Sequence, residues 1–305
     1  MKIAIAGGTG FVGQRLAELL VQAGHTVAVL TRNPATASIG STEHLELVGY
    51  DPVSVESWQT ALADCDGVVN LVGEPLTESR WNDRQKDEIL RSRTRTTSTM
   101  VKAIAELETK PSVVVSASAV GYYGPHQDEE LDESAAPAGD FLARVCKEWE
   151  AAAKPLENLG VRLVQVRIGI VLGPDGGALG KMLGPFQMFV GGPIGSGKQW
   201  LSWIHRDDLA GLIMYALTTN SVSGVLNGTA PNPVKMSEFS DTLGQVLARP
   251  SWLPVPPIAL EIVLGEAAQV VLTGQRVLPK RTLEQGYKFT YPQLEPALRE
   301  ILVES

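Results

Sequence analysis

The sequence predicts an α/β fold, with a doubly wound parallel sheet followed by a second, smaller mixed C-terminal domain. Over the first two-thirds of the 305 residues, short apolar runs alternate with helical patterns, as strands and helices do around parallel sheets. After Gly169 the pattern changes to glycine- and proline-rich loops between short helices. We therefore expect residues 1–168, joined by roughly 201–228, to form the sheet domain. Residues 169–200 and 229–305 are expected to form the smaller domain.

The individual elements follow in order from the residue pattern. The runs at residues 2–6 and 26–30 are apolar and rich in β-branched side chains, which predicts two buried strands separated by a helix. Further strands are expected at residues 45–48, 67–72, 112–118, 161–168, 203–205 and 225–227. Helices are expected at residues 57–63, 83–106, 141–159 and near 179–190, with loops at 173–177 and 191–197. Asp207 and Asp208 are predicted to cap a helix that runs on to Thr218.

The turn after the first strand is rich in glycine and reads Gly7-Gly8-Thr9-Gly10-Phe11-Val12-Gly13. Glycine is needed where a Cβ would block a tight turn, the approach of a ligand or the contact between helix and strand. In a strand–turn–helix–strand unit, backbone N–H groups and the positive end of the helix face the pyrophosphate of a dinucleotide. The sheet domain is therefore predicted to be a Rossmann-type dinucleotide-binding domain. The alternative is a glycine-rich turn that binds nothing.

The end of the second strand indicates which dinucleotide would bind. A site selective for NAD(H) usually has Asp or Glu there to bind the ribose 2′-hydroxyl, whereas this chain has Arg32 between Thr31 and Asn33. A guanidinium pairs with a 2′-phosphate through two charge-assisted hydrogen bonds, and a carboxylate would repel it. The sequence thus favours NADP(H) over NAD(H), unless Arg32 is an ordinary solvated loop arginine.

Composition excludes several classes of function. The formal net charge is −8 and the chain has no basic block, so we expect no nucleic-acid partner. The apolar runs are too short and interrupted to cross a bilayer, so no membrane association is expected. The chain enters a strand at once, which leaves no room for a targeting peptide and favours a cytoplasmic location. Cys65 and Cys146 form no CxxC pair and the four histidines are scattered, so no metal site is expected.

Polar side chains follow the strand predicted at residues 112–118. In an open α/β sheet, ligands bind at the carboxyl ends of the strands, so Ser118 is expected to hold a substrate oxygen near the nicotinamide. Ser116 is more simply explained by packing at the strand end. Tyr122 and Tyr123 are equally suited to contact or proton exchange with a substrate and to packing of the loop.

Several motifs together resemble the extended short-chain dehydrogenase/reductases of the NAD(P)-dependent epimerase/dehydratase family. They are the glycine turn, which also has GxxGxxG spacing, the Asn70-Leu71-Val72-Gly73 strand end, the run from Ser116 to Gly124, and Arg167. A closer resemblance is to an uncharacterised "epimerase family protein" branch with a C-terminal domain of unknown function. It rests on Gly121 to Gly124, Phe141 to Glu150, Gly195 to His205, Gln275 to Pro279 and Gly286 to Phe289. Together the motifs cover essentially the whole chain.

The resemblance implies a parallel sheet of about seven strands, a small-molecule substrate and a homodimer. It also implies that the cofactor contacts the glycine turn, the ends of several strands and one helix. The residues concerned are Gly7, Gly8, Thr9, Gly10, Phe11, Val12, Gly13, Thr31, Arg32, Asn33, Leu71, Val72, Gly73, Glu74, Ser116, Lys147 and Arg167.

The chain departs from the family at one catalytic position. The family pattern is a serine, matched by Ser118, followed by Tyr-x-x-x-Lys on a helix. The residue four positions before Lys147 is Ala143, so the acid/base tyrosine is absent. The resemblance implies that Lys147 binds the nicotinamide ribose, unless it is only a lysine of the helix surface. Positions 143 and 147 are expected to share one face of their helix. The candidates to replace the tyrosine are Tyr122, Tyr123, Glu74 and His205.

Two functions are compatible with this pattern. The first is an NADP(H)-dependent oxidoreductase or epimerase that acts on a small hydroxyl- or carbonyl-bearing substrate, nucleotide-sugar-like molecules included. Its catalytic residues would be Ser118, Lys147 and a tyrosine of the Tyr122-Tyr123 pair. The second is a non-catalytic NADP(H)-binding or redox-sensing protein on the same fold, which Ala143 favours. A scaffold with an empty site is a third hypothesis.

Overall fold

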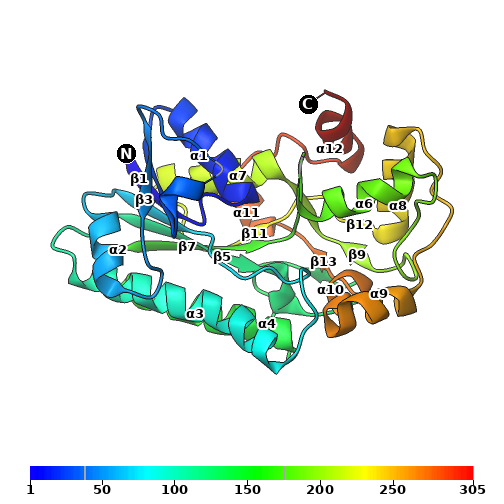
Figure 1. Cartoon of the computed structure of the whole chain (residues 1–305), viewed down its shortest axis with the longest axis horizontal. Coiled ribbons are helices and arrows are strands. Elements are labelled where there is room, and N and C mark those ends of the chain that lie inside the picture. The colour runs from blue at the N-terminus through cyan, green and yellow to red at the C-terminus, as the bar shows by residue number, and fades with distance from the viewer. Residues whose placement is uncertain (38, 175, 305) are drawn as a thin grey trace.

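The computed structural model describes residues 1–37, 39–174 and 176–304, so Asp175, in the loop predicted at 173–177, lies outside the described part (Figure 1). Its largest sheet has seven parallel strands in the order β11-β7-β5-β4-β1-β2-β3. These strands are β1 (Lys2–Ala6), β2 (Thr26–Thr31), β3 (Leu45–Gly49), β4 (Gly67–Asn70), β5 (Val113–Ala119), β7 (Arg162–Ile168) and β11 (Gly224–Gly228). The strand order reverses between β1 and β4, so the predicted doubly wound, Rossmann-type sheet is confirmed.

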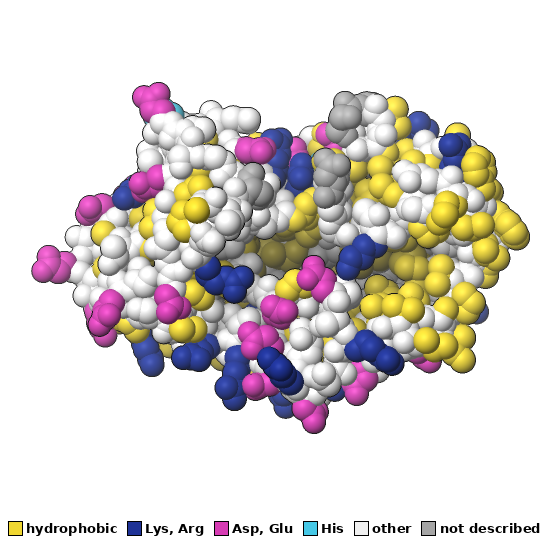
Figure 2. All heavy atoms as spheres, in the orientation of Figure 1, with side chains coloured by type: hydrophobic (Ala, Val, Ile, Leu, Met, Phe, Trp, Pro, Cys, Tyr) yellow, Lys and Arg dark blue, Asp and Glu magenta, His cyan; other side chains and the backbone are white. Residues whose placement is uncertain are grey.

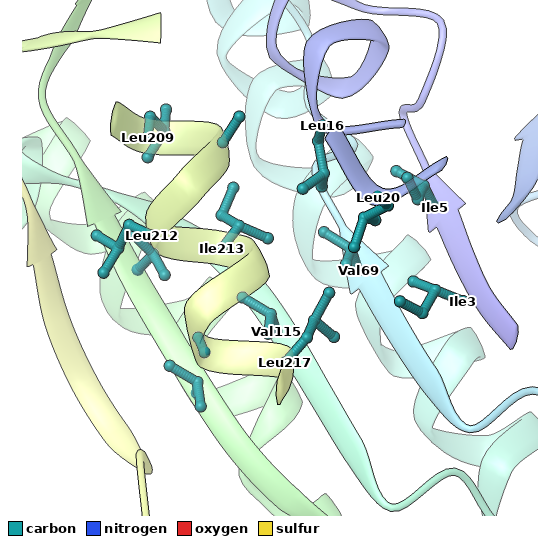
Figure 3. Close-up of a cluster of buried hydrophobic side chains, with 14 of the residues drawn as sticks. Ile3, Ile5, Leu16, Leu20, Val69, Val115, Leu209, Leu212, Ile213 and Leu217 are labelled. Atoms are coloured by element: carbon teal, nitrogen blue, oxygen red, sulfur yellow. The ribbon is translucent and has the colours of Figure 1, made fainter. Parts of the chain in front are cut away.

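Helices cover both faces of this sheet. On one face lie α1 (Phe11–Gln22) and α7 (Arg206–Thr218), whose leucines and isoleucines point toward one another and toward the strands (Figure 3). On the other face lie α2 (Val55–Leu62), α3 (Asp83–Glu106), α4 (Phe141–Ala153) and α5 (Pro155–Asn158). The single helix expected at 141–159 is therefore two. Pro155 causes the break, because it has no N–H to donate to the preceding turn and is favoured at the start of a helix.

The cap of α7 also differs from the prediction. His205, not Asp207 or Asp208, is the capping residue, and its Nδ1 accepts the Asp207 N–H at 3.1 Å. The Asp207 carboxylate instead accepts two hydrogen bonds from Arg15 on α1, at 2.8 and 2.7 Å. The Asp208 carboxylate accepts backbone N–H groups near the C-terminal end of the chain, beginning with Thr290 at 2.7 Å. Both carboxylates thus connect distant segments.

The remaining elements form a smaller lobe with its own core. Its strands make three two-stranded sheets, which pair β8 (Ile170–Leu172) with β10 (Trp203–His205), β9 (Trp200–Leu201) with β12 (Val234–Lys235), and β6 (Glu130–Leu131) with β13 (Arg276–Val277). Its helices are α6 (Gly177–Gln187), α8 (Met236–Leu247), α9 (Pro257–Leu264), α10 (Gln269–Leu272), α11 (Lys280–Glu284) and α12 (Leu294–Arg299). The mixed character predicted for the C-terminal part is confirmed, while the predicted domain limits stay predictions. Within the described ranges, no helix is long and apolar enough to cross a membrane.

Candidate functional site

The glycine turn between β1 and α1 has a shape that only glycine allows at its tightest points. Gly7 has a φ of +81°, and its carbonyl accepts the Gly10 N–H at 3.1 Å. A Cβ on Gly13 would lie 2.3 Å from the Gly7 oxygen, and a Cβ on Gly8 would lie 2.8 Å from a methyl of Val29. Helix, turn and strand therefore meet without side chains between them, which leaves the backbone open to a ligand. The residues present fit a dinucleotide.

The N-terminal end of α1 faces out of this turn. Gly10 is the capping residue and supplies no side-chain acceptor, so the N–H groups of the first turn, which begins at Phe11 and Val12, keep their hydrogen-bonding capacity. Thr9 takes part through its carbonyl, which accepts the Gln14 side-chain amide at 2.8 Å. Together with the helix dipole, these N–H groups make a site for a phosphate.

Arg32 follows the last residue of β2 and is exposed. Its neighbours serve the local turn: Asn33 caps a short helix by accepting the Ala35 N–H at 3.2 Å, and the Thr31 hydroxyl accepts the Asn33 N–H at 3.4 Å. Thr31 and Asn33 thus fix the backbone while the guanidinium of Arg32 projects from it. The sequence predicts that Arg32 binds the 2′-phosphate of NADP(H) at this position.

The end of β4 lies against the glycine turn. A Cβ on Gly7 would be 3.0 Å from the carbonyl carbon of Leu71, and β4 ends two residues before the predicted Val72, because the Asn70 side chain accepts the Val72 N–H. The loop that follows is held by Arg93 of α3, which the sequence analysis missed. Gly73 makes room for this guanidinium, which donates to the Glu74 carbonyl at 3.0 Å.

The run Arg91, Arg93 and Arg95 on α3 contains the signal that could have identified Arg93. Three arginines at alternate positions cannot share one face of a helix, so at least one must turn away from solvent. Arg91 and Arg95 are exposed, and Arg93 is half-buried at the wall of a cavity. Burial lowers the pKa of Arg93, and its ring contact is with Trp149 at 5.2 Å. Arg93 belongs to the site as a cation between the cofactor loop and the cavity.

The polar side chains at the end of β5 are closed into a buried network. Ser118 is 2% exposed and donates to Glu150 Oε1 at 2.7 Å. Arg167 on β7 pairs with both oxygens of the same carboxylate, at 2.8 and 2.9 Å. Burial alone would lower the pKa of Arg167, but these hydrogen bonds raise it above its usual value. The structure therefore shows Ser118 and Arg167 as buried partners of Glu150, and their predicted contacts with substrate and cofactor stay predictions.

Tyr123 belongs to the same network. It is fully buried, donates to Asn227 Oδ1 at 2.7 Å and accepts from Arg167 at 3.0 Å. Burial raises the pKa of its phenol to about 12. Tyr122 is half-buried, with the Arg167 guanidinium 3.4 Å from its ring centroid, and Ser116 is buried in the sheet. These side chains therefore take part in packing and hydrogen bonding within the protein, and the cofactor contact that the resemblance implies for Ser116 stays a prediction.

Helix α4 lines the cavity with residues other than the predicted pair. Ala143 is fully buried and Lys147 is exposed, so neither lines the cavity, and the cofactor contact of Lys147 stays a prediction. The i, i+4 pair that lines the cavity is one position earlier, Leu142 and Cys146. The Cys146 thiol donates to the Ala119 carbonyl at 3.5 Å, and burial raises its pKa to about 11. Neither position carries a tyrosine or a lysine.

The cavity lies where β5 and β7 end and has a volume of about 240 Å³. Its wall is mostly apolar, with large side chains from both lobes. These are Leu76, Trp81, Val120, Phe141, Leu142, Val145, Trp149, Ile168, Ile170, Trp200 and Val270. Arg93, Asp140 and Cys146 are its ionisable lining residues. Figure 2 shows the molecule hollowed between its lobes, with hydrophobic side chains on the floor. In the described ranges, no group of His, Cys, Asp and Glu could hold a metal ion.

An open trough of about 840 Å³ adjoins the cavity at Pro125, Thr273 and Gly274. Its charged lining residues are Asp128 and Glu129, and His126 pairs with Glu129 at 2.6 Å. Asp128 pairs with Lys235 at 3.1 Å. Both carboxylates of the trough therefore have partners within the protein, and its described lining residues include no Lys or Arg.

The other two candidates for the missing acid/base lie away from the cavity wall. Glu74 is held beside α3, where its N–H donates to Ser92 at 3.1 Å and its carboxylate accepts from Gln85 at 3.5 Å. His205 is 1% exposed, caps α7 through Nδ1 and contacts Glu300 through Nε2 at 2.9 Å. Both are thus used in packing the fold.

Comparison with known proteins gives the following matches. Residues 3–227 match the "NAD dependent epimerase/dehydratase family", and residues 255–301 match a domain of unknown function, DUF1731. The chain is 47% identical over 304 residues to "Epimerase family protein SDR39U1 homolog, chloroplastic" of Arabidopsis thaliana, covering 99% of this chain and 87% of that protein. It is 38% identical over 305 residues to "Epimerase family protein YfhF" of Bacillus subtilis, covering 100% and 99%. A crystal structure of human epimerase family protein SDR39U1 (isoform 2) with NADPH aligns with a TM-score of 0.88 and 39% identity, covering 99% of each chain.

Proposed function

The chain belongs to the NAD-dependent epimerase/dehydratase family, as its motifs predict, and from this premise we propose that it binds NADP(H) and exchanges hydride with a small substrate. The observation that carries the proposal is the glycine turn, where a Cβ on Gly13 would collide with the Gly7 carbonyl at 2.3 Å. A glycine turn this tight, at the N-terminus of a helix, leaves its backbone N–H groups open to a diphosphate. The human relative whose structure contains NADPH supports the same cofactor.

The preference for NADP(H) over NAD(H) rests on Arg32. Replacing it in Arg32→Asp should raise the Kd for NADPH by about tenfold or more, because a charge-assisted pair becomes a repulsion. The Kd for NADH should stay the same or fall. Arg84→Asp, at an exposed arginine on α3, serves as the matched control and should change neither value. Equal Kd changes for both dinucleotides in Arg32→Asp would show that this arginine does not read the 2′-phosphate.

The substrate is expected to be compact and largely apolar. The cavity of about 240 Å³ is smaller than the ~300–1,000 Å³ of sites for drug-sized ligands. The described lining residues of the adjoining trough include no Lys or Arg, the cations that a nucleoside diphosphate would need. We therefore favour a small aldehyde, ketone or alcohol over a nucleotide sugar.

Bound NADPH supplies hydride at nicotinamide C4, and the protein must supply a proton to the substrate oxygen. Among the lining residues, Cys146 and Asp140 can exchange a proton. With a pKa of about 11, the Cys146 thiol holds its proton at neutral pH and can donate it. Asp140 caps α4 by accepting the Ala143 N–H at 2.9 Å, which fixes its carboxylate at the cavity wall.

The reaction is tested by NADPH oxidation across a panel of small aldehydes and ketones. Cys146→Ala should lower kcat by about a hundredfold if the thiol donates the proton. Cys65→Ala is the matched control, because Cys65 is also a buried thiol but lies in the core behind α2. Asp140→Asn keeps a helix cap and tests the carboxylate in the same assay. Unchanged kcat in both site variants would remove these residues from the chemistry.

A second candidate, an NADP(H)-binding protein without catalysis, is favoured by the closed network at Ser118, Glu150, Arg167 and Tyr123. In that case the purified protein would bind NADPH, gain thermal stability from it, and oxidise none across the panel. NADPH oxidation that Cys146→Ala or Asp140→Asn abolishes would reject this candidate. The two outcomes are mutually exclusive for the same preparation.

A further inference from the structure

Arg206, the first residue of α7, has a guanidinium with no polar partner among the described residues. Its Nε–H is buried and donates no hydrogen bond to the residues described. Its contact is with the ring of Phe11, whose centroid lies 5.1 Å from the guanidinium carbon. A buried donor without an acceptor is unfavourable and calls for an explanation. A ligand that brings an acceptor would supply one.

The acidic residue next to Arg206 already pairs with another arginine. Asp207 is bidentate to Arg15, at 2.8 and 2.7 Å, and this pairing lowers the pKa of Asp207 even though burial alone would raise it. Other arginines that are buried or half-buried have ion-pair or hydrogen-bond partners within the protein. Arg167 pairs with Glu150, and Arg162 donates to three backbone carbonyls at the end of α7 and beyond. Arg276 also has a buried Nε without a partner, but it pairs with Glu130 at 3.1 Å, whereas half-buried Arg206 has no ion pair among the described residues.

Arg206 lies beside the first turn of α1, where a phosphate would bind. Phe11 is the first residue of α1, so its backbone N–H belongs to the turn that faces a dinucleotide diphosphate. Its ring packs against three glycines near the start of α6, because Cβ atoms on Gly173, Gly176 or Gly177 would lie 2.8–3.1 Å from it. The arginine is thus stacked on a fixed ring beside the phosphate site, on the side where α1 and α7 run together (Figure 1, Figure 3).

We propose that Arg206 binds the diphosphate of the dinucleotide and completes the phosphate site that the glycine turn begins. The proposal rests on the proposed NADP(H) binding and adds a residue to that site. A planar guanidinium held against an aromatic ring loses little freedom when it pairs with phosphate oxygens. Arg32 and Arg206 then have separate tasks, because the 2′-phosphate is found in NADP(H) alone and the diphosphate is common to both dinucleotides.

The test is the affinity of Arg206→Gln for three ligands, measured by protein fluorescence or calorimetry. The Kd for NADPH and the Kd for NADH should both rise by roughly tenfold. The Kd for adenosine 2′-phosphate, which lacks the diphosphate, should stay within about twofold of the wild type. Arg206→Lys keeps the charge and should lose less affinity than Arg206→Gln. Arg32→Asp should show the opposite pattern, with NADPH and adenosine 2′-phosphate weakened and NADH spared.

Arg249→Gln is the matched control, because Arg249 also stacks on a phenylalanine, with its guanidinium carbon 4.5 Å from the centroid of Phe189, far from the turn. It should change none of the three affinities. The melting temperature of each unliganded variant shows whether it is folded. If Arg206→Gln is folded and binds both dinucleotides as the wild type does, or weakens NADPH alone, the proposal is wrong. If the wild type binds neither dinucleotide, the proposed function fails as well.

Discussion

The two sides of the strand reversal in the main sheet treat their polar groups in opposite ways. Beside β1 and β2, the turn at Gly7 to Gly13 leaves backbone N–H groups unused and Arg32 exposed. Beside β5 and β7, the hydroxyl of Ser118, the phenol of Tyr123 and the guanidinium of Arg167 are satisfied within the protein. Both sides have residue types expected of a dehydrogenase. On the first side, called the open side below, these groups are free to bind a ligand. On the second side, called the closed side, they already form hydrogen bonds within the protein.

This difference separates binding from catalysis. A donor that is already paired with a buried carboxylate must break that hydrogen bond before it can serve a substrate, and breaking it leaves a charge unsatisfied in the interior. The site is therefore built around the cofactor more than around the acid/base chemistry of its family. For catalysis we therefore propose the cavity residues Cys146 and Asp140.

The largest expected effect comes from opening the closed side. Arg167→Met would leave Glu150 buried without its ion-pair partner, so the free energy of unfolding should fall by about 3–5 kcal/mol in a urea titration. The double variant Arg167→Met/Glu150→Leu removes both charges and should recover most of that loss. NADPH affinity should be unchanged in the folded protein. A loss of NADPH affinity with normal stability would instead make Arg167 a cofactor ligand, as the family resemblance implied.

The next effect comes from filling the open side. In Gly13→Ala the new Cβ would meet the Gly7 carbonyl, so helix and turn must separate. The free energy of unfolding should fall by about 1–3 kcal/mol, and the Kd for NADPH should rise by about tenfold or more. Gly180→Ala in α6 is the control, because no heavy atom lies within 4 Å of its Cβ position. It should stabilise the helix slightly and leave NADPH binding alone. Tight NADPH binding by Gly13→Ala would contradict this account of the turn.

The open side could be predicted from sequence because its parts are local. Strand, glycine turn, helix and second strand lie within the first 33 residues, and each glycine answers a backbone need of its neighbours. The same holds for the seven parallel strands, whose apolar runs are continuous because both faces are buried. Helix ends were less certain. The cap at His205 and the break at Pro155 depend on local chemistry that the apolar pattern does not show.

The closed side could not be predicted in the same way, because its contacts join distant segments. Tyr123 bonds to Asn227, 104 positions away, and Ser118 reaches Glu150 across 32. Which face α4 presents to the cavity depends on how the helix lies against β5, and the lining residues are Leu142 and Cys146, not Ala143 and Lys147. Successive residues on a helix point about 100° apart, so the sequence alone does not show which pair lines the cavity.

The smallest expected effect concerns the acidity of Tyr123. A catalytic tyrosine of this family works with a pKa lowered toward neutrality, whereas burial raises the pKa of Tyr123 to about 12. The folded state thus holds this proton more tightly than the unfolded state, whose tyrosine pKa is about 10. The stabilisation is complete below pH 10 and is lost as the pH rises from about 10 toward 12. By pH 11 it should have fallen by about 1 kcal/mol.

The measurement compares the wild type with Tyr123→Phe by absorbance at the phenolate band and by urea unfolding between pH 8 and pH 11. The variant should lack one late-titrating phenol, and the stability gap between the two proteins should narrow as the pH rises, because only the wild type loses this contribution. A phenol that titrates below pH 9 and disappears in Tyr123→Phe would contradict the closed network. It would also support the catalytic role that the sequence allowed for Tyr123. Whether the pKa of Tyr123 is raised or lowered therefore shows whether its phenol belongs to the buried hydrogen-bond network or is free to exchange a proton with a substrate.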